Sequence, residues 1–236
     1  MNVVAIHQPE FMPWLGYFHK MLHAGTYIIL DHVQFKKRYF ENRNRIVSPR
    51  EEVWWIGVPV RCKGRYTQAI ADVEIDGDGR WARTLLERVR HAYGKAPHFQ
   101  RYFDELTHTV SGREYGKLVD LNMALIGFFR RHFGIDTPLV FSSGQGVNGS
   151  KGSGLILDLC LKAGAGRYLC GASGKDYLIE EDFSHAGVDI EYLNYTPPSY
   201  PQLCPNHVSH LSSLDLLFNA GPDAGRILAQ PIGGKP

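Results

Sequence analysis

The first thirty residues place two short apolar runs on either side of one amphipathic segment, and this order restricts strongly which folds the chain can adopt. Residues 2–6 (NVVAI) and 27–30 (YIIL) are rich in β-branched or aromatic side chains, which favours buried strands. Between them, residues 13–24 carry apolar side chains at helical spacing and are followed by Gly25, a residue typical of helix C-termini. Parallel strands joined by a helix take a right-handed crossover. The opening therefore predicts a βαβ unit.

The rest of the chain adds strands and a block of helices. Predicted strands cover residues 52–60, 69–76, 137–143, 166–171 and 187–195. Predicted helices fall within residues 80–133, 154–164 and 212–221. These elements predict an α/β fold with a Rossmann-like sheet, parallel or mostly parallel, helices on both faces and a helical insertion at about residues 80–133. We expect one α/β domain over residues 1–229 and a disordered tail at 230–236.

Composition excludes several classes of protein. Hydrophobic residues make up 44% and charged residues 21% of the 236 residues, which is typical of globular proteins and not of disordered chains. Apolar runs are too short for a transmembrane helix, and the N-terminus lacks the basic region of a signal peptide. The four cysteines are far apart and form no C-x-x-C pair, which fits reduced thiols. We therefore expect a cytoplasmic protein.

Positive charge is concentrated in one stretch. Residues 36–65 hold nine Lys or Arg against three Glu, although the net charge of the whole chain is only +2. The stretch fits a phosphorylated small molecule, a polyanion or a solvated surface. The small net charge does not favour nucleic acid as the partner.

The first candidate site segment follows the first predicted strand. His7 and Gln8 end this strand, and Glu10 lies in the loop before the helix. In parallel α/β sheets, ligands bind beyond the carboxyl ends of the strands, so these side chains are expected to face a ligand crevice. The alternative is that His7 only caps the turn.

The second candidate segment, residues 31–46, follows the second predicted strand and opens onto the same edge. Asp31 and Gln34 come first and are expected to hold an amine or an acceptor hydroxyl. Arginine side chains follow, and these suit two-point contacts with phosphate or carboxylate. Residues 41–46 (ENRNRI) also fit an edge strand, whose alternation leaves at most one pair facing the site. The preferred anion contacts are Asn44 with Arg38 or Arg45.

The third candidate segment is a glycine-rich turn after the strand predicted at 166–171. Backbone amides of such a turn can bind an anion, and a lysine lies beside them. The residues expected to contact substrate are Ser173, Gly174, Lys175 and Tyr177. Neither this turn nor residues 142–154 fits the P-loop pattern, so a P-loop kinase is disfavoured. A flexible connector is the alternative.

The last candidate segment precedes the final helix. Cys204, His207 and His210 have the spacing C-x2-H-x2-H, which can present three metal ligands, but no partner cluster of Cys or His exists elsewhere. We therefore assign no metal. Tyr200 and Gln202 are expected to line the mouth of the site.

Several of these motifs, read in order, resemble the WbqC-like family. They are HQPEFMPWLGYFHKM, YIILDHVQF with NRNRI, YLCGASGKDYL, YPQ and LSSLDLLFNAGP. The resemblance covers nearly the whole chain and implies an association with bacterial O-antigen and surface-polysaccharide genes. It also implies transfer of an amino acid, notably glycine, to a sugar, and similar proteins are linked to amino-acid transfer onto modified bases in phage DNA. Residues 204–210 are less aromatic than in the family, which argues further against a metal role for His207 and His210.

A weaker likeness is to pantothenate synthetase and the Rossmann-like nucleotidyltransferase group, and it concerns the order of elements around His7 and the Lys175 turn. Such enzymes activate a carboxylate as an adenylate on ATP before an amine attacks it. Their H-x-G-H signature is absent, because Pro9 and Glu10 follow His7 and Gln8. ATP is therefore an open cofactor and not an assigned one.

The sequence favours a transferase that joins an amino acid, glycine first, to a nucleotide-linked sugar or another phosphorylated acceptor. The predicted catalytic residues are His7, Asp31 and Lys175. The predicted substrate contacts are Gln8, Glu10, Gln34, Arg38, Asn44, Arg45, Ser173, Gly174, Tyr177, Tyr200 and Gln202. Whether the amine or the carboxylate reacts stays open. The alternatives are an ATP-dependent ligase that forms an acyl-adenylate and a non-catalytic protein that binds sugar nucleotides.

Overall fold

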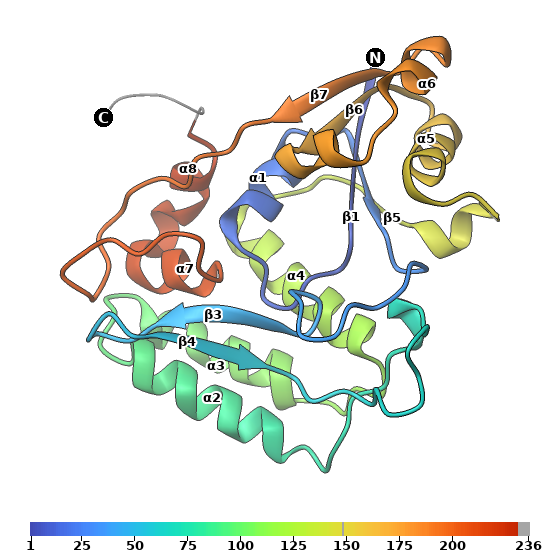
Figure 1. Cartoon of the computed structure of the whole chain (residues 1–236). Helices are drawn as coiled ribbons and strands as arrows, with labels where there is room; N and C mark the ends of the chain where they lie inside the picture. Colours follow the sequence, from blue (N-terminus) through green and yellow to red (C-terminus); the bar gives the residue numbers. More distant parts are fainter. Residues whose placement is uncertain (148, 231–236) are drawn as a thin grey trace.

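A parallel sheet of five strands forms the centre of the molecule (Figure 1). The computed structural model describes residues 1–147 and 149–230, so residues 231–236 of the predicted tail lie outside the described residues. The strand order is β5-β2-β1-β6-β7, and every neighbouring pair is parallel. The strands are β1 (Asn2–His7), β2 (Thr26–Ile29), β5 (Leu139–Phe141), β6 (Ala165–Gly171) and β7 (Asp189–Leu193). The predicted α/β class and the opening βαβ unit are confirmed.

Helices cover both faces of this sheet, as the apolar strands require. Successive strand residues point to opposite faces, so Val4 and Ile6 pack with α5 (Gly152–Lys162) and α6 (Glu180–His185). Ala5 lies in the larger core on the other face, together with α1 (Leu15–Leu22). Burying an aliphatic side chain such as Ile6 contributes roughly 1.5–3 kcal/mol, so the two cores hold the sheet between its helices.

The predicted helical insertion is present and carries a small second sheet. Its helices are α2 (Arg80–Tyr93), α3 (Phe99–Ser111) and α4 (Leu118–Phe133). The second sheet is an antiparallel hairpin of β3 (Arg43–Val47) and β4 (Val53–Gly57). In Figure 1 this hairpin lies between the carboxyl end of β1 and helices α2 and α3. The helices α7 (Leu214–Ala220) and α8 (Ala224–Leu228) complete the chain within its described part.

The strand predicted at residues 69–76 is wrong. This segment forms a short 3-10 helix, η1 (Ile70–Asp72), and its β-pairing is limited to the isolated bridges Gln34–Ala69, Val60–Ile75 and Glu74–Lys117. Ile70 and Val73 are buried, but the backbone bonds to the loop after β2, where the Ile70 amide donates to the Val33 carbonyl and the Ala71 amide to the Asp31 carbonyl. Alternation in this segment therefore reflects burial against a loop and not sheet pairing.

The order of the strands creates one switch point. From β1 the chain adds β2 and then β5 on one side, and it crosses to the other side to add β6 and β7. Loops that leave the carboxyl ends of β1 and β6 therefore run in opposite directions, and ligands of open α/β sheets bind in the crevice that this divergence creates. Within the described part of the chain, none of the helices is long and apolar enough to cross a membrane.

Candidate functional site at the carboxyl edge of the sheet

The loop from β1 to α1 is fixed in place by three other segments. Asn122 of α4 donates through Nδ2 to the Pro9 carbonyl at 2.8 Å, and the Phe11 amide donates to the Phe40 carbonyl at 2.9 Å. Asn44 of β3 donates through Nδ2 to the carbonyls of Phe11, at 3.2 Å, and Met12, at 2.9 Å. The loop that carries Gln8, Pro9 and Glu10 is thus held by residues from distant parts of the sequence.

The same loop contains a backbone conformation that few side chains adopt. Met12 has φ of 43° and is fully buried, and the Asn44 amide holds its carbonyl. A non-glycine residue in this region costs about 1–3 kcal/mol and persists only where the surroundings enforce it. Such strain is common at functional sites, which supports the placement of the candidate site here.

At the end of β1, His7 can act as a base and Glu10 as an acid. Their closest atoms, His7 Nε2 and Glu10 Oε1, are 3.8 Å apart, and the His7 side chain is 26% exposed while that of Glu10 is 8% exposed. Burial, and then the charge of Lys20, lowers the pKa of His7 to about 3. Burial, and then the charge of Glu41, raises the pKa of Glu10 to about 8. At neutral pH the imidazole is therefore a neutral base beside a mostly protonated carboxyl group.

The tautomer of His7 follows from its neighbour. His7 Nδ1 lies 3.2 Å from the Gln8 carbonyl, which accepts hydrogen bonds only, so Nδ1 carries the proton. Nε2 of the neutral ring then keeps its lone pair. His7 is thus able to accept a proton from a ligand at Nε2, and its partial exposure lets a ligand reach it.

Lys20 and Glu41 are buried ionisable groups that the sequence did not single out. Lys20, on α1, donates from Nζ to the Ile6 carbonyl at 3.0 Å, and burial lowers its pKa to about 8. Glu41, just before β3, is 2% exposed, and burial raises its pKa to about 7. Ionisable groups with strongly shifted pKa values cluster at functional sites, so both residues join the candidate site.

Asp31 lies at the carboxyl end of β2 but is engaged with the end of β5. Its Oδ1 accepts hydrogen bonds from Ser142 Oγ and the Ser143 amide, both at 2.9 Å, and its Oδ2 accepts one from Ser143 Oγ at 2.7 Å. His32 Nδ1 lies 2.6 Å from the same Ser142 Oγ. Asp31 therefore fixes the turn after β5. Gln34 is exposed, and its Nε2 donates to the Tyr66 carbonyl.

The turn after β6 faces the β1 loop across the switch point. It forms the 3-10 helix η3 (Ala172–Asp176), in which Ser173 and Lys175 are exposed and Gly174 is buried. A Cβ at Gly174 would lie 2.1 Å from Cys170 Sγ, so this position requires glycine. Lys175 Nζ lies 5.1 Å from the centre of the Tyr192 ring, and Tyr177 is exposed beside the turn.

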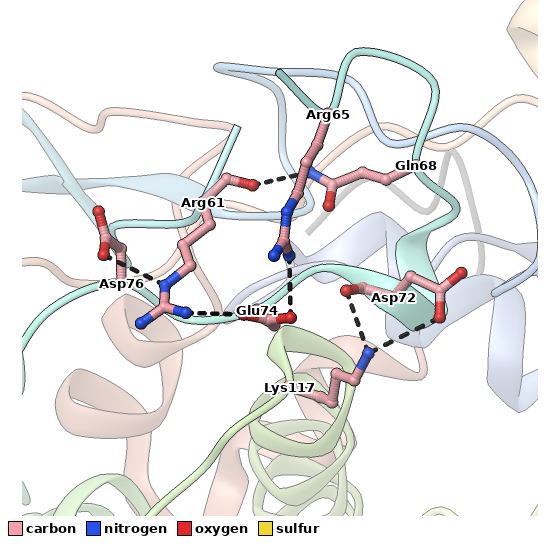
Figure 2. Close-up of polar contacts among 7 residues, drawn as sticks. All are labelled: Arg61, Arg65, Gln68, Asp72, Glu74, Asp76 and Lys117. Carbon is pink, nitrogen blue, oxygen red and sulfur yellow. Dashed lines mark hydrogen bonds and ion pairs between the residues drawn. The ribbon is translucent and has the colours of Figure 1, made fainter. Parts of the chain in front are cut away.

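The basic stretch is largely engaged within the protein. Arg45 donates to the His210 carbonyl at 2.9 Å, and the Arg43 guanidinium lies 4.0 Å from the centre of the Trp55 ring. Figure 2 shows Arg61 and Arg65 both bound to Glu74, each at 2.9 Å. The exposed residue Arg38 has φ of 60°. Asn44, which was predicted to contact substrate, is fully buried and holds the β1 loop instead.

Tyr200 and Gln202 are also bound within the protein. Tyr200 Oη and Gln202 Nε2 both donate to Asp215 Oδ2, at 2.8 and 2.6 Å, and Asp215 is fully buried in α7. Cys204 Sγ lies 3.6 Å from Gln202 Oε1, and the His210 ring stacks on Trp14. Among the described residues, no group of three or more His, Cys, Asp or Glu side chains is arranged to hold a metal ion.

The structure thus brings together only part of the predicted set. The carboxyl ends of β1 and β6 are adjacent and carry His7, Gln8, Glu10, Ser173, Gly174 and Lys175. Lys20, Glu41 and Asn122 were missed. A signal existed for Asn122, because it interrupts the apolar face of residues 118–133, and for Lys20, which repeats the helical spacing of the buried Tyr17. The sequence holds no such signal for Glu41.

The strand order and the buried ionisable cluster at the β1 end define a Rossmann-like α/β protein with a candidate site at the carboxyl edge of its sheet. The chain belongs to the WbqC-like protein family, whose model matches residues 8–227, and this confirms the resemblance seen in its motifs. It is also similar to the "Uncharacterized protein Rv1507c" of Mycobacterium tuberculosis (strain ATCC 25618 / H37Rv), with 34% identity over 225 residues that cover 95% of this chain and 96% of that protein. No solved structure matches the chain, so the likeness to pantothenate synthetase stays a prediction.

Proposed function

We propose that this protein is a transferase that joins an amino acid to a nucleotide-linked sugar or a comparable phosphorylated acceptor. The reaction takes place at the adjacent carboxyl ends of β1 and β6. The observation that carries the proposal is that polar residues follow both strands at this switch point. His7 and Glu10 lie at and after the end of β1, and the Ser173–Lys175 turn follows β6. Open α/β sheets bind their ligands at such a point.

In this proposal His7 is the general base. Its Nε2 keeps a lone pair and is partly exposed, so it accepts the proton that the attacking amine or hydroxyl releases. Lys175 and the amides of the exposed turn bind the phosphate oxygens of the acceptor. Asp31 fixes the turn after β5 through its hydrogen bonds with Ser142 and Ser143. An amine that attacks a phosphorylated carbon expels the phosphate and needs no ATP, so direct transfer is the simplest reaction for this site.

The test combines binding with product detection. Thermal shifts are measured with UDP-glucose, ATP and glycine, because a ligand that binds only the folded state stabilises it by about 2.7 kcal/mol at one hundred times its Kd. Products from glycine and a panel of nucleotide sugars are then identified by mass spectrometry, with and without ATP. We expect stabilisation by a nucleotide sugar and an ATP-independent adduct. The His7→Ala variant should lose about 100-fold or more in rate, while the exposed-histidine control His185→Ala keeps the wild-type rate.

The outcomes separate the competing functions. An adduct that forms only with ATP, together with release of pyrophosphate, identifies the ATP-dependent ligase instead. Stabilisation by nucleotide sugar without any product, and unchanged by Lys175→Ala, identifies a binding protein that uses another surface. If none of these compounds stabilises the protein, the proposed acceptor class is wrong. The Lys63→Ala variant is the control for loss of one exposed positive charge.

A further inference from the structure

Three buried residues beside His7 neighbour one another. Asn122 Nδ2 donates to the Pro9 carbonyl and to the Glu41 carbonyl, both at 2.8 Å, so this amide joins the peptide next to Glu10 to the backbone of Glu41. The charge of Glu41 also contributes to the raised pKa of Glu10, which places the two carboxyl groups near each other. Glu10, Glu41 and Asn122 are 6%, 2% and 0% exposed.

Each of these residues has an oxygen atom that lacks a donor. Among the described residues, no group forms a hydrogen bond with Glu10 Oε2, Glu41 Oε2 or Asn122 Oδ1, although all three atoms are buried. Buried polar atoms are nearly always hydrogen-bonded, because an acceptor that has left water without gaining a donor is costly. Asn122 uses both of its N–H groups on carbonyls, so its oxygen atom is the one left over. Once both carboxyl groups are ionised, the cluster therefore presents three acceptors without donors.

The charges of the cluster are also unbalanced. Lys20 is the cation near Glu10, but its Nζ donates to the Ile6 carbonyl. Lys36 is the cation near Glu41, and within the described chain neither lysine forms an ion pair with these two carboxyl groups. Burying a carboxylate is favourable only with a positive partner and hydrogen bonds to its oxygens. A ligand that supplies both is a cation with several N–H donors.

We propose that Glu10, Glu41 and Asn122 form a subsite for the primary ammonium group of the amino-acid substrate. This inference rests on the proposed function and names the part of the site that holds the amine before it reacts. One proton of the ammonium passes to the Glu10 carboxylate, the neutral amine attacks the phosphorylated carbon and expels the phosphate, and His7 Nε2 takes the second proton. A primary ammonium has three N–H donors, which equals the number of acceptors without a donor. His7 Nε2 lies 3.8 Å from Glu10 Oε1, and the His7 side chain is partly exposed, so the cluster lies close to the protein surface. A metal ion fits less well, since Mg²⁺ and Ca²⁺ need six or more oxygen ligands and no metal-ligand group exists among the described residues.

The ammonium subsite gives a specific proton balance. The titratable groups around Glu10 are His7 on β1, Tyr17 and Lys20 on α1, Tyr27 on β2 and Glu41 before β3. Glu10 has a pKa of about 8 in the free protein and must ionise to pair with an ammonium group, so binding releases a proton at pH 7. Calorimetric titration in two buffers with different heats of ionisation measures this release directly.

In the experiment, glycine or glycolate is titrated into the full-length protein saturated with UDP-glucose. Glycolate has a hydroxyl group in place of the amine of glycine. We expect glycine to bind at least 10-fold more tightly than glycolate and to release close to one proton. The Glu41→Gln and Glu10→Gln variants should lose glycine affinity at least 10-fold while UDP-glucose still stabilises them. The Glu10→Gln variant should also release fewer protons than the wild type, because only Glu41 is left to ionise. Glu114→Gln, at an exposed glutamate, is the matched control and should bind glycine like the wild type.

The outcomes distinguish the subsite from the function. Equal binding of glycine by the wild type and by both glutamine variants, with UDP-glucose binding intact, overturns the subsite and leaves the proposed function standing. Equal affinity for glycine and glycolate has the same meaning. If UDP-glucose and the other nucleotide sugars fail to stabilise even the wild type, the proposed function fails first. Melting curves show whether each variant folds, and the two glutamine variants give independent tests if one does not.

Discussion

Two groups of charged side chains in this protein lie in opposite environments. In the loop between β4 and α2, Arg61 and Arg65 share the carboxylate of Glu74, and Lys117 binds Asp72 beside them (Figure 2). These side chains are partly or largely exposed, between 33% and 71%. Each charge has an opposite partner and also remains in contact with water.

The ionisable groups at the carboxyl end of β1 are instead buried and, among the described residues, unpaired. Glu10, Lys20 and Glu41 are at most 6% exposed, and no ion pair joins them within the described chain. Their pKa values move toward neutrality, to about 8 for Glu10, about 8 for Lys20 and about 7 for Glu41. Exposed ion pairs contribute little to stability, whereas buried unpaired groups reduce it. The buried cluster is therefore better explained by ligand binding than by folding, and four substitutions test this difference.

The largest effect on stability is expected for Asn44→Ala. This side chain is fully buried and donates to the carbonyls of Phe11 and Met12, so its removal leaves two buried acceptors without donors. Each costs about 1–3 kcal/mol, and we expect a loss of about 2–4 kcal/mol in the free energy of unfolding by denaturant titration. Asn206→Ala, which removes an exposed amide bonded to Glu51, is the control and should change stability by less than about 1 kcal/mol. Equal losses in both variants would contradict the role of Asn44 as the clamp of the β1 loop.

The next largest effect concerns the pH dependence of the free energy of unfolding. Glu10→Gln should remove the part of this dependence that Glu10 contributes. Folded Glu10 keeps its proton up to about pH 8, whereas an unfolded glutamate releases it near its ordinary pKa of 4.5. Between these values the folded state binds more protons, so this group makes stability fall as pH rises, and the loss is complete above pH 8. His7 acts oppositely, but only between about pH 3 and 6.5, where the unfolded state binds its proton.

The measurement is the stability of Glu10→Gln minus that of the wild type at pH 5 and pH 8. We expect this difference to grow by about 3 kcal/mol in favour of the variant, because one pKa unit corresponds to about 1.4 kcal/mol. Glu114→Gln should show a constant difference, since that side chain is exposed. A flat difference for Glu10→Gln would mean that the carboxyl group is ionised in the folded protein at neutral pH.

A smaller effect is expected for Tyr200→Phe. Asp215 is fully buried like Glu10, but its Oδ2 accepts hydrogen bonds from Tyr200 and Gln202, so it is at least partly satisfied. Loss of the Tyr200 hydroxyl should cost about 1–2 kcal/mol and leave UDP-glucose and glycine binding unchanged. Tyr177→Phe, at an exposed tyrosine, is the stability control. Loss of ligand binding in Tyr200→Phe would restore this tyrosine to the substrate contacts that its sequence position suggested.

The fold was predictable where periodicity and burial coincide. The runs at residues 2–6 and 27–30 are apolar on both sides, so their assignment to buried parallel strands was correct. Residues 69–76 also alternate, but their amides bond to a loop, and alternation alone does not distinguish these cases. The position of His7 at the carboxyl edge followed from chain order alone, because it directly ends a parallel strand.

The sequence did not predict which residues form the buried cluster. Glu41 lies in a run of charged and amide residues that is typical of an exposed strand, and it becomes buried because α4 and the β1 loop close over it. Asn44 was predicted to bind an anion, yet it donates to backbone carbonyls. Whether a polar side chain faces a ligand or a distant backbone depends on tertiary packing, which one-dimensional periodicity does not encode.

The smallest effect is expected for Arg61→Ala in the exposed network. Arg61 is 54% exposed and pairs with Glu74 at 2.9 Å and with Asp76 at 3.5 Å, while Arg65 keeps its own contact with Glu74. Water screens these pairs, and a second arginine remains, so the melting temperature should fall by less than about 3 °C and by less still at 1 M salt. The exposed-lysine control Lys95→Ala should behave similarly. If Arg61→Ala weakens UDP-glucose binding while Lys95→Ala does not, the paired arginines take part in anion recognition, and the contrast between an inert surface network and a functional buried cluster fails.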